Sequence, residues 1–355
     1  MKRPILAAVL SLCTAFFGYA QGKLDFKLGA QYIFDNHEFD PSGRTILNSE
    51  TIHFYRFTPS LNWKCAENEN WSTTIHAGVD LVKNAGVGKM KLADMVEDTP
   101  VYLGTRFCDG SESFMAAFGI YPRRLSDGYY SELLISEETI QSDFNMDGMF
   151  LQYRNSTVYA ELGLDWMGRY GEVEKERFQV FTSSYWRPVD FLSFGLSGSF
   201  YHYAGSVAAP GVVDNHIVEP FVLLDLSNYT FLRALTLRLG GFYSYQRDRL
   251  HDDLRQPIGT EVEVYGRLLG FELRNSSSYT GDFLPFYNGT DSAGNPYGDR
   301  LYRGSRFYNG FYDRLELSWA PHLSSRFDLK VAFRFHYNAD GFLGSEQRVS
   351  LYYNL

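Results

Sequence analysis

Polar, small and charged side chains alternate with apolar ones along many stretches of this sequence. This alternation places charge on one face of a β-strand and apolar groups on the other. Such charges could orient and sieve small polar solutes, or they could pair across neighbouring strands and only keep a wall hydrated. The basic members are Lys27, Arg56, Arg238, Arg274, Arg314, Lys330, Arg334 and Arg348, and the acidic members are Asp80, Glu161, Asp165, Glu261, Glu263, Glu272 and Glu316.

The charges are distributed unevenly along the chain. Most of the basic members lie in the last four expected strands, and closure of a barrel would place those strands beside Lys27 on the first. A long loop at about 123–146 is acidic, and its Leu133-Leu134-Ile135 could be buried if the loop folded inward. The loop would then form a constriction opposite a basic wall; the other interpretation is an exposed surface loop. Its constricting carboxylates would be Asp127, Glu132, Glu137 and Glu138.

Other chemistries find little support in the residue spacing. The histidines are scattered, and none sits with a nucleophile and an acid in a catalytic pattern. No cysteine and histidine cluster has zinc-ligand spacing, and no glycine-rich phosphate loop opens a helix. A net charge of −9 gives no basic field for nucleic acid. We therefore expect neither an enzyme nor a cofactor or metal site, and a disulfide between Cys65 and Cys108 stays open.

Long strands must position these charges. Over most of 24–34 and again over 348–355, apolar residues alternate with polar or small ones. Strands of soluble proteins are commonly about five or six residues long, so alternation over this length favours lipid contact over a soluble sandwich. Charged residues make up 21% of the chain, aromatic residues 17%, and the mean hydropathy is −0.27, as expected for walls that are apolar on one face. Because no later apolar run could form a spanning helix, only a closed barrel could cross a membrane.

The predicted fold is therefore all-β: a single transmembrane antiparallel up-and-down β-barrel of about 16 strands. A change of phase around 266–269 indicates a tight turn; a bulge there would reduce the count to about 14. The connections alternate in length, which predicts short periplasmic turns, long extracellular loops and two periplasmic termini. Short connections are expected at 65–70, 108–112, 155–156, 187–190, 228–232, 267–269 and 321–325, and long ones at 36–49, 84–98, 123–146, 168–175, 203–215, 247–259, 282–310 and 339–345.

Both ends of the chain resemble sorting signals. Met1-Lys2-Arg3, followed by an apolar stretch and small residues, predicts a signal peptide over 1–20, which leaves 21–355 as the barrel. The last strand ends in an aromatic residue and an apolar residue, Tyr353 and Leu355. We interpret these two residues as the signal that barrel-assembly machinery reads.

Two segments of the C-terminal third carry a resemblance. The first is a loop with GDFLPFY at 281–287 and YGDRLYRGSRFY at 297–308, and the second is a strand, FDLKVAFRFH, at 327–336. Together they resemble uncharacterised porin-like outer-membrane β-barrel proteins of Bacteroidota. The resemblance covers about 75 residues closely and the rest only in pattern. It implies a barrel in the outer membrane of a Gram-negative bacterium, and it implies no catalytic residues.

The sequence favours a porin-like channel, through which small hydrophilic solutes would diffuse passively along a charged lumen. Its expected partners are outer-membrane lipid and lipopolysaccharide, barrel-assembly machinery, small polar solutes and, in a homotrimer, further copies of the chain. The alternative is a non-conducting barrel that acts as an adhesin or as an accessory subunit of an outer-membrane complex. A barrel for a hydrophobic ligand is disfavoured because the inward faces are mostly charged or small.

Overall fold

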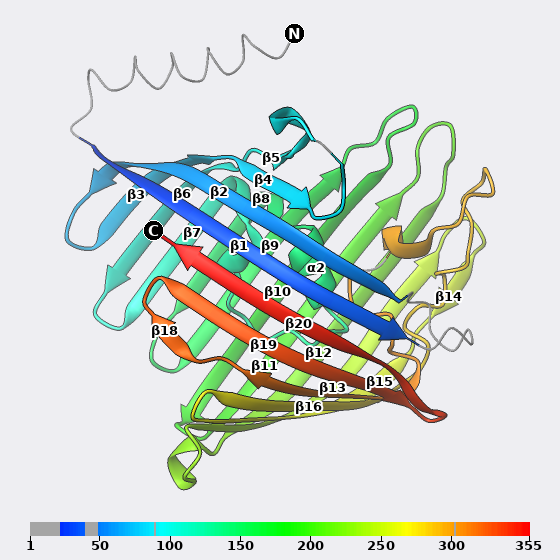
Figure 1. The fold of residues 1–355 in the computed structure, drawn as a ribbon. Coiled ribbons are helices and arrows are strands. Elements are labelled where there is room, and N and C mark those ends of the chain that lie inside the picture. Colours follow the sequence, from blue (N-terminus) through cyan, green and yellow to red (C-terminus); the bar gives the residue numbers. More distant parts are fainter. Residues whose placement is uncertain (1–21, 40–48, 89, 302) are drawn as a thin grey trace.

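The strands of this chain close into one antiparallel barrel of 16 strands (Figure 1), which confirms the predicted fold. The computed structural model describes residues 22–39, 49–88, 90–301 and 303–355, so the predicted signal peptide lies outside the described residues. The barrel closes because β1 (Lys23–Phe39) pairs with β2 (Glu50–Glu67) on one side and with β20 (Gly341–Asn354) on the other.

The remaining strands follow one another around the wall. β3 (Trp71–Gly78) and β4 (Asp80–Asn84) both pair with β2, while β5 (Val96–Asp98) and β6 (Val101–Asp109) continue the sheet. β14 (Asp253–Arg255) and β18 (His322–Ser324) are short additions at strand ends. The other strands are β7 (Glu112–Pro122), β8 (Asn145–Arg154), β9 (Val158–Gly168), β10 (Glu176–Val189), β11 (Leu192–Ala204), β12 (Val212–Asp225), β13 (Ala234–Asp248), β15 (Ile258–Leu268), β16 (Phe271–Thr280), β17 (Gly310–Trp319) and β19 (Phe327–Asn338).

The five helices within the described residues are all short. Four are 3-10 turns: η1 (Leu92–Asp94), η2 (Arg123–Leu125), η3 (Ser227–Tyr229) and η4 (Gly298–Leu301). The fifth is the α-helix α2 (Glu137–Ser142). Within the described part of the chain, no helix has the length and apolar character needed to cross a bilayer.

The phase change near 266–269 is a turn, which settles the strand count. Leu268 at the end of β15 pairs with Phe271 at the start of β16. The two residues between them, Leu269 and Gly270, have φ of 51° and 86°. Two consecutive left-handed residues form the kind of tight hairpin turn whose twist matches that of the strands. The alternative of a bulge in one long strand, and with it a count of 14, is wrong.

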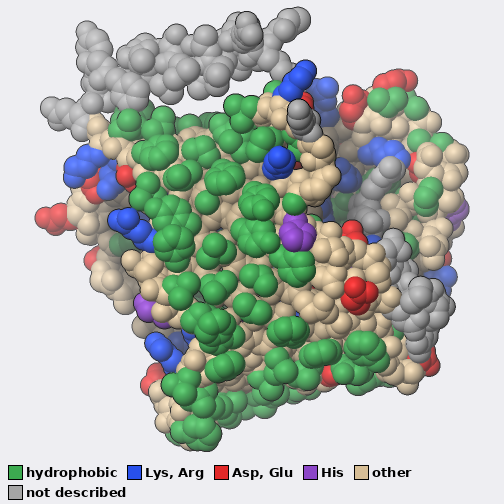
Figure 2. Space-filling view, viewed as in Figure 1, with side chains coloured by type: hydrophobic (Ala, Val, Ile, Leu, Met, Phe, Trp, Pro, Cys, Tyr) green, Lys and Arg blue, Asp and Glu red, His purple; other side chains and the backbone are tan. Residues whose placement is uncertain are grey.

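The outer face of the barrel carries a belt of apolar side chains, and charged groups gather toward its rims (Figure 2). Large apolar side chains that alternate outward along the strands remain exposed, among them Phe26 at 53%, Leu239 at 54% and Phe333 at 48%. Exposed apolar surface of this extent marks an interaction surface. A belt that follows the outside of a closed sheet matches the hydrocarbon of a membrane.

The hydrophobic core lies inside the barrel, where two loops pack against inward-facing wall residues. Leu133 and Leu134 come from the β7–β8 loop, and Phe283 and Tyr308 come from the β16–β17 loop. They join a cluster with Phe181 and other inward residues of β8, β10, β12 and β13. The interior therefore contains folded chain, and the remaining space lies around it. Cys65 and Cys108 are both free and exposed.

Candidate functional site in the barrel lumen

The β7–β8 loop enters the barrel and carries α2 behind β1 (Figure 1). Its two ends are neighbours, because Pro122 pairs with Asn145 across β7 and β8. α2 begins after Ser136, whose side chain accepts a hydrogen bond of 3.1 Å from the Thr139 N–H. Two glutamates in the first turn complement the helix dipole. The sequence thus forms a short helix with its acidic end at the tip of the loop.

The tip of this loop contacts the basic wall. Glu137 forms ion pairs with Arg334 and Arg348, and its distance to Arg348 is 2.5 Å. Glu132 lies 3.0 Å from Arg314. All three arginines are buried. Burial raises the pKa of the Glu137 carboxyl, but Arg334 and Arg348 outweigh burial, and the pKa ends below its ordinary value. The tip of the loop therefore folds into the barrel and contacts the basic wall.

The remaining loop carboxylates lie away from that wall. Asp127, expected opposite the basic wall, is instead exposed and lies 2.5 Å from Arg154 on β8. The prediction failed at Asp127 because the loop has not yet crossed the lumen at this position. Glu138 lies on the exposed side of α2, 3.4 Å from Arg306 of the β16–β17 loop. Of the four predicted loop carboxylates, only Glu132 and Glu137 therefore contact the wall arginines.

The base of the loop is held by the opposite arrangement of charge. Arg123, which is 4% exposed, lies 2.6 Å from Asp165 on β9 and 2.9 Å from Asp143. Glu161 on β9 accepts hydrogen bonds from the hydroxyls of Ser126 and Tyr130, at 2.6 and 2.7 Å. Here the wall supplies the carboxylates and the loop supplies the donors. The sequence placed Glu161 and Asp165 on the inner wall, but it gave no signal for Arg123.

The two interior loops hold each other in place. The Ser305 N–H donates to the Glu132 carbonyl at 2.6 Å, and the Ser136 N–H donates to the Arg303 carbonyl at 2.9 Å. Between these bonds, a Cβ on Gly304 would lie 1.7 Å from the Leu133 carbonyl oxygen. Only glycine therefore permits this approach of the two backbones.

The β16–β17 loop is also fixed at its far end. The Lys175 ammonium donates to Asp291 at 2.9 Å, and the Asn295 N–H donates to the same carboxylate at 2.9 Å. Burial raises the pKa of Asp291, but these hydrogen bonds outweigh it and lower the pKa to about 2. Phe286 and Tyr297 are buried in a second cluster with Tyr203 of β11. This loop is part of the packed interior.

The other predicted wall residues occupy inward positions on their strands, and most pair with a neighbour. Arg56 lies 3.3 Å from Asp80 and its guanidinium donates to the Gln141 carbonyl of α2 at 3.1 Å. Arg238 lies 2.8 Å from Glu261. Lys330 lies 2.6 Å from Glu316 and 3.8 Å from Glu272. Pairing across strands, as one interpretation of these charges predicted, accounts for them.

A smaller group of predicted wall residues lacks such partners. Within the described chain, no ion pair joins Lys27, Arg274 or Glu263. Arg274 instead places its guanidinium 5.5 Å from the centroid of the Tyr265 ring. These are the wall charges whose fields are least neutralised by contact.

Three wall carboxylates that pair with wall arginines were missed from the sequence although their positions fit the same alternation. Asp35 on β1, Glu219 on β12 and Glu346 on β20 are all buried inside the barrel. Asp35 pairs with Arg348, Glu219 lies 3.1 Å from Arg238, and Glu346 lies 3.0 Å from Arg334. The period of two along each strand was the signal that could have identified them.

Space remains on both sides of the loop. A cavity of about 440 Å³ lies against β8–β10 and is lined by charged groups that include Asp143, Arg177 and Arg303. Another, of about 310 Å³, lies between α2 and the wall of β1, β19 and β20. Both are polar enough and large enough to hold several water molecules.

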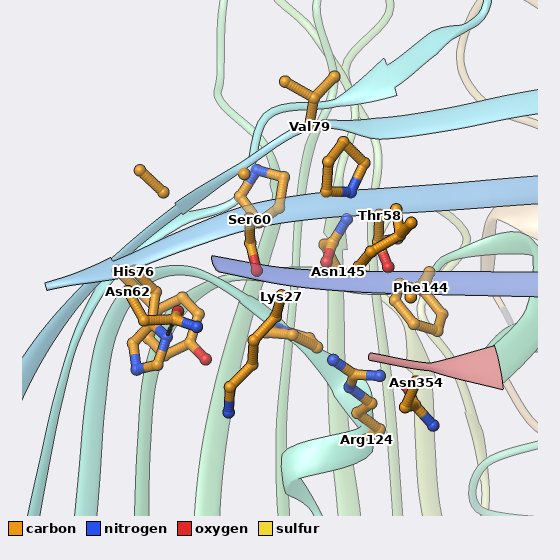
Figure 3. Close-up of a pocket in the computed structure, with 18 of the residues that line it drawn as sticks. Lys27, Thr58, Ser60, Asn62, His76, Val79, Arg124, Phe144, Asn145 and Asn354 are labelled. Carbon is orange, nitrogen blue, oxygen red and sulfur yellow. Dashed lines mark hydrogen bonds between the residues drawn. The ribbon is translucent and has the colours of Figure 1, made fainter. Parts of the chain in front are cut away.

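A third recess, of about 150 Å³, lies beside β1–β3 (Figure 3). Lys27 and Arg124 both line it, and the described residues around it include no aspartate or glutamate. The Arg124 guanidinium lies 5.9 Å from the centroid of the Phe144 ring. His76 stacks on Tyr102 with ring centroids 4.2 Å apart. The charged side chains that line this recess are therefore basic.

Comparisons with known proteins agree with the fold. No protein-family model matches the chain, and no curated protein does. OmpTΔL8, a loop L8 deletion mutant of the Vibrio cholerae outer membrane protein OmpT, superposes with a TM-score of 0.54 at 10% identity, over 94% of this chain and 99% of that one. Salmonella typhi OmpF, solved with daunomycin, gives a TM-score of 0.52 at 11% identity, over 94% and 98%. A trimer form of Vibrio cholerae OmpT gives 0.52 at 10% identity, over 94% and 99%. The chain thus has the fold of outer-membrane β-barrels.

Proposed function

We propose that this chain is a porin-like channel of a Gram-negative outer membrane that passes small hydrophilic solutes by passive diffusion. The observation that carries the proposal is the contact between the acidic loop tip and the arginines of β17, β19 and β20. This contact makes the loop narrow the lumen, and the charged groups that line the remaining polar cavities would orient and sieve small polar solutes. The polar cavities on both sides of the loop are the candidate path.

The proposal has further parts. Both termini would lie in the periplasm, and the apolar belt would contact lipid and lipopolysaccharide. Tyr353 and Leu355 would direct assembly, and the chain would belong with the Bacteroidota barrels that its sequence resembles. A homotrimer is supported by the trimer form of the Vibrio cholerae protein, and chemical crosslinking in detergent would test it. No catalytic role is included.

Single-channel conductance in a planar bilayer tests the proposal. Wild-type protein should conduct steadily, and the variant Glu132→Gln/Glu137→Gln should change both conductance and ion selectivity. Asp127→Asn is the matched control, because this exposed carboxylate pairs with Arg154 away from the basic wall. A silent bilayer from protein that heat-modifiable gel mobility shows to be folded would contradict the proposal.

The packed interior favours a second candidate, a non-conducting barrel that is an adhesin or serves a partner protein. Leu133 and Leu134 are 0% and 1% exposed, as Phe283 and Tyr308 are at 0% and 1%. Apolar packing between two loops and several strands is more than a hydrated pore requires. This candidate predicts no conductance and a partner that co-purifies from outer membranes, and these two measurements separate the candidates.

A further inference from the structure

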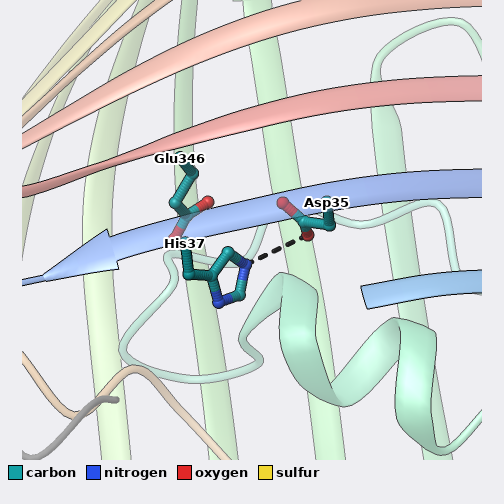
Figure 4. Close-up of side chains that lie close together, drawn as sticks. All are labelled: Asp35, His37 and Glu346. Atoms are coloured by element: carbon teal, nitrogen blue, oxygen red, sulfur yellow. Dashed lines mark ion pairs between the residues drawn. The ribbon is translucent and has the colours of Figure 1, made fainter. Parts of the chain in front are cut away.

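One histidine and two carboxylates meet at the seam where the barrel closes, and a second histidine lies beside one of the carboxylates. Asp35 and His37 are alternate residues of β1 and therefore face the same side, and Glu346 of β20 is the register partner of His37. One ligand atom from each of these three side chains can be chosen so that all lie within 4.8 Å of one another (Figure 4). His336 on β19 lies beside them, with its Nε2 3.4 Å from Glu346 Oε1.

Several of these atoms are buried without a hydrogen-bond partner. Asp35 is 2% exposed, and its Oδ1 has no partner. His336 is also 2% exposed, and its Nε2 has none. His37 Nε2 lies at the ion-pair distance of 3.2 Å from Asp35 Oδ2, just as His336 Nε2 lies 3.4 Å from Glu346 Oε1. Buried polar atoms nearly always have partners, so the unpartnered Asp35 Oδ1, next to these two histidine–carboxylate contacts, indicates a place for a ligand.

The surrounding groups orient these side chains as the outer shell of a metal site does. Arg348 donates to Asp35 Oδ2, which leaves Oδ1 free. Arg334 donates to Glu346 Oε2 at 3.0 Å, which leaves Oε1 toward His336. The Tyr312 hydroxyl lies 2.8 Å from His336 Nδ1, which fixes the ring with Nε2 toward the cluster. Asp35, Glu346 and His336 are thus each held through one atom and keep another atom available.

The two arginines do not carry an uncompensated positive charge into the cluster. Arg348 also pairs with Glu137 at 2.5 Å, and Arg334 also pairs with Glu316 at 2.7 Å. These carboxylates lie outside the four-residue cluster and offset the arginines. The cluster also opens on the cavity of about 310 Å³ that Asp35, His37, His336 and Glu346 help to line, so a hydrated ion has a way in.

We propose that Asp35, His37 and Glu346 bind a divalent transition-metal ion, with His336 as the fourth ligand. Two imidazole nitrogens and two carboxylate oxygens suit Zn²⁺, whereas Ca²⁺ and Mg²⁺ prefer oxygen alone. The ion would join β1 to β20 and β19 beneath α2, and it would lock the seam of the barrel. The spacing of residues in the sequence gave no signal for this site, because its ligands come from the two ends of the chain.

Zn²⁺ titration by calorimetry, on chelator-treated full-length protein in detergent, tests the proposal. We expect one ion per chain for the wild type, and at least a tenfold loss of affinity in His37→Ala and in Asp35→Asn. His53→Ala is the control, because His53 lies on β2 in contact with Tyr32 and Phe34, outside the cluster. Heat-modifiable mobility checks that each variant is folded.

A second readout does not depend on the variants. Zn²⁺ should raise the temperature at which wild-type protein loses its folded gel mobility, and Mg²⁺ at the same concentration should not. Absence of stoichiometric Zn²⁺ binding by the folded wild type would overturn the proposal. Loss of affinity in His53→Ala equal to that in His37→Ala would also overturn it.

Discussion

The interior loop docks on two walls of the barrel through ion pairs of opposite polarity. At its base, 123–131, the wall holds the carboxylates Glu161 and Asp165 and the loop holds the donors. At its tip, 132–142, the wall holds arginines and the loop holds the carboxylates. The tip carboxylate Glu137 is 34% exposed beside a cavity, whereas Asp165 at the base is 3% exposed. The ion pairs of the base are therefore the more deeply buried anchor, whereas the ion pairs of the tip are more exposed and the tip is also held by the buried Leu133 and Leu134.

The largest change in conductance should follow from Gly304→Ala, which disturbs the tip through the neighbouring loop. The new methyl group would lie 1.7 Å from the Leu133 carbonyl oxygen, so one backbone must withdraw. Overpacking of this kind costs about 1–3 kcal/mol. We expect the tip to leave the basic wall, conductance to rise several-fold, and Glu132 and Glu137 to become accessible to a glutamate-specific protease.

Gly241→Ala is the matched control for this experiment. Gly241 lies in β13, and a Cβ there would meet no atom within 4 Å. The control should keep wild-type conductance and wild-type protease resistance. If folded Gly304→Ala protein shows the same conductance and resistance as the control, the two loops do not hold each other as described.

A comparison of Arg123→Ala with Arg334→Ala tests which contact is the anchor. Loss of Arg123 leaves the buried Asp165 carboxylate without its ion-pair partner, which costs about 3–5 kcal/mol. Loss of Arg334 should lower the free energy of unfolding less, by about 1–3 kcal/mol. Two of its partner carboxylates retain other ion pairs: Glu316 with Lys330 at 2.6 Å and Glu137 with Arg348 at 2.5 Å. Urea unfolding, followed by gel mobility, should place Arg123→Ala below Arg334→Ala in stability. The reverse order would make the tip the anchor.

The pH dependence of loop docking should also distinguish the tip from the base. The pKa of Glu137 is lowered in the docked loop because Arg334 and Arg348 outweigh burial. A carboxyl whose pKa is lowered in this way stabilises docking fully at a pH above its undocked pKa of about 4.3. That contribution is lost as the pH falls through the pKa of the docked carboxyl. Protease protection of the tip should therefore stay constant from about pH 7 to pH 5 and decline only in stronger acid. Glu137→Gln should lose this decline, and release of the wild-type tip near pH 6 would refute the assignment.

The sequence predicted the barrel and its inner wall better than it predicted the interior. Alternation decides which residues face inward because the strand period is two, so Arg334 and Glu161 could be assigned to the inner wall from the pattern alone. The loops have no such period. Leu133 suggested that the β7–β8 loop is buried, but nothing in the sequence placed Arg123 against Asp165, because that contact depends on where the loop crosses the lumen. Asp35 and Glu346 meet for a related reason: closure joins the ends of the chain.

The smallest expected effect concerns the basic recess beside β1–β3, which includes none of the ion pairs that dock the loop, although Arg124 belongs to the loop base. Lys27 and Arg124 line it, and the described residues around it supply no carboxylate side chain. If solutes pass this recess, its positive charge should favour anions, although salt screens it over about 10 Å at 0.1 M. Lys27→Gln/Arg124→Gln should therefore shift the reversal potential in a salt gradient toward cations and leave single-channel conductance nearly unchanged. Lys64→Gln, which removes an exposed charge already 2.6 Å from Glu67, should shift nothing. Equal shifts in both variants would mean that general surface charge sets the selectivity.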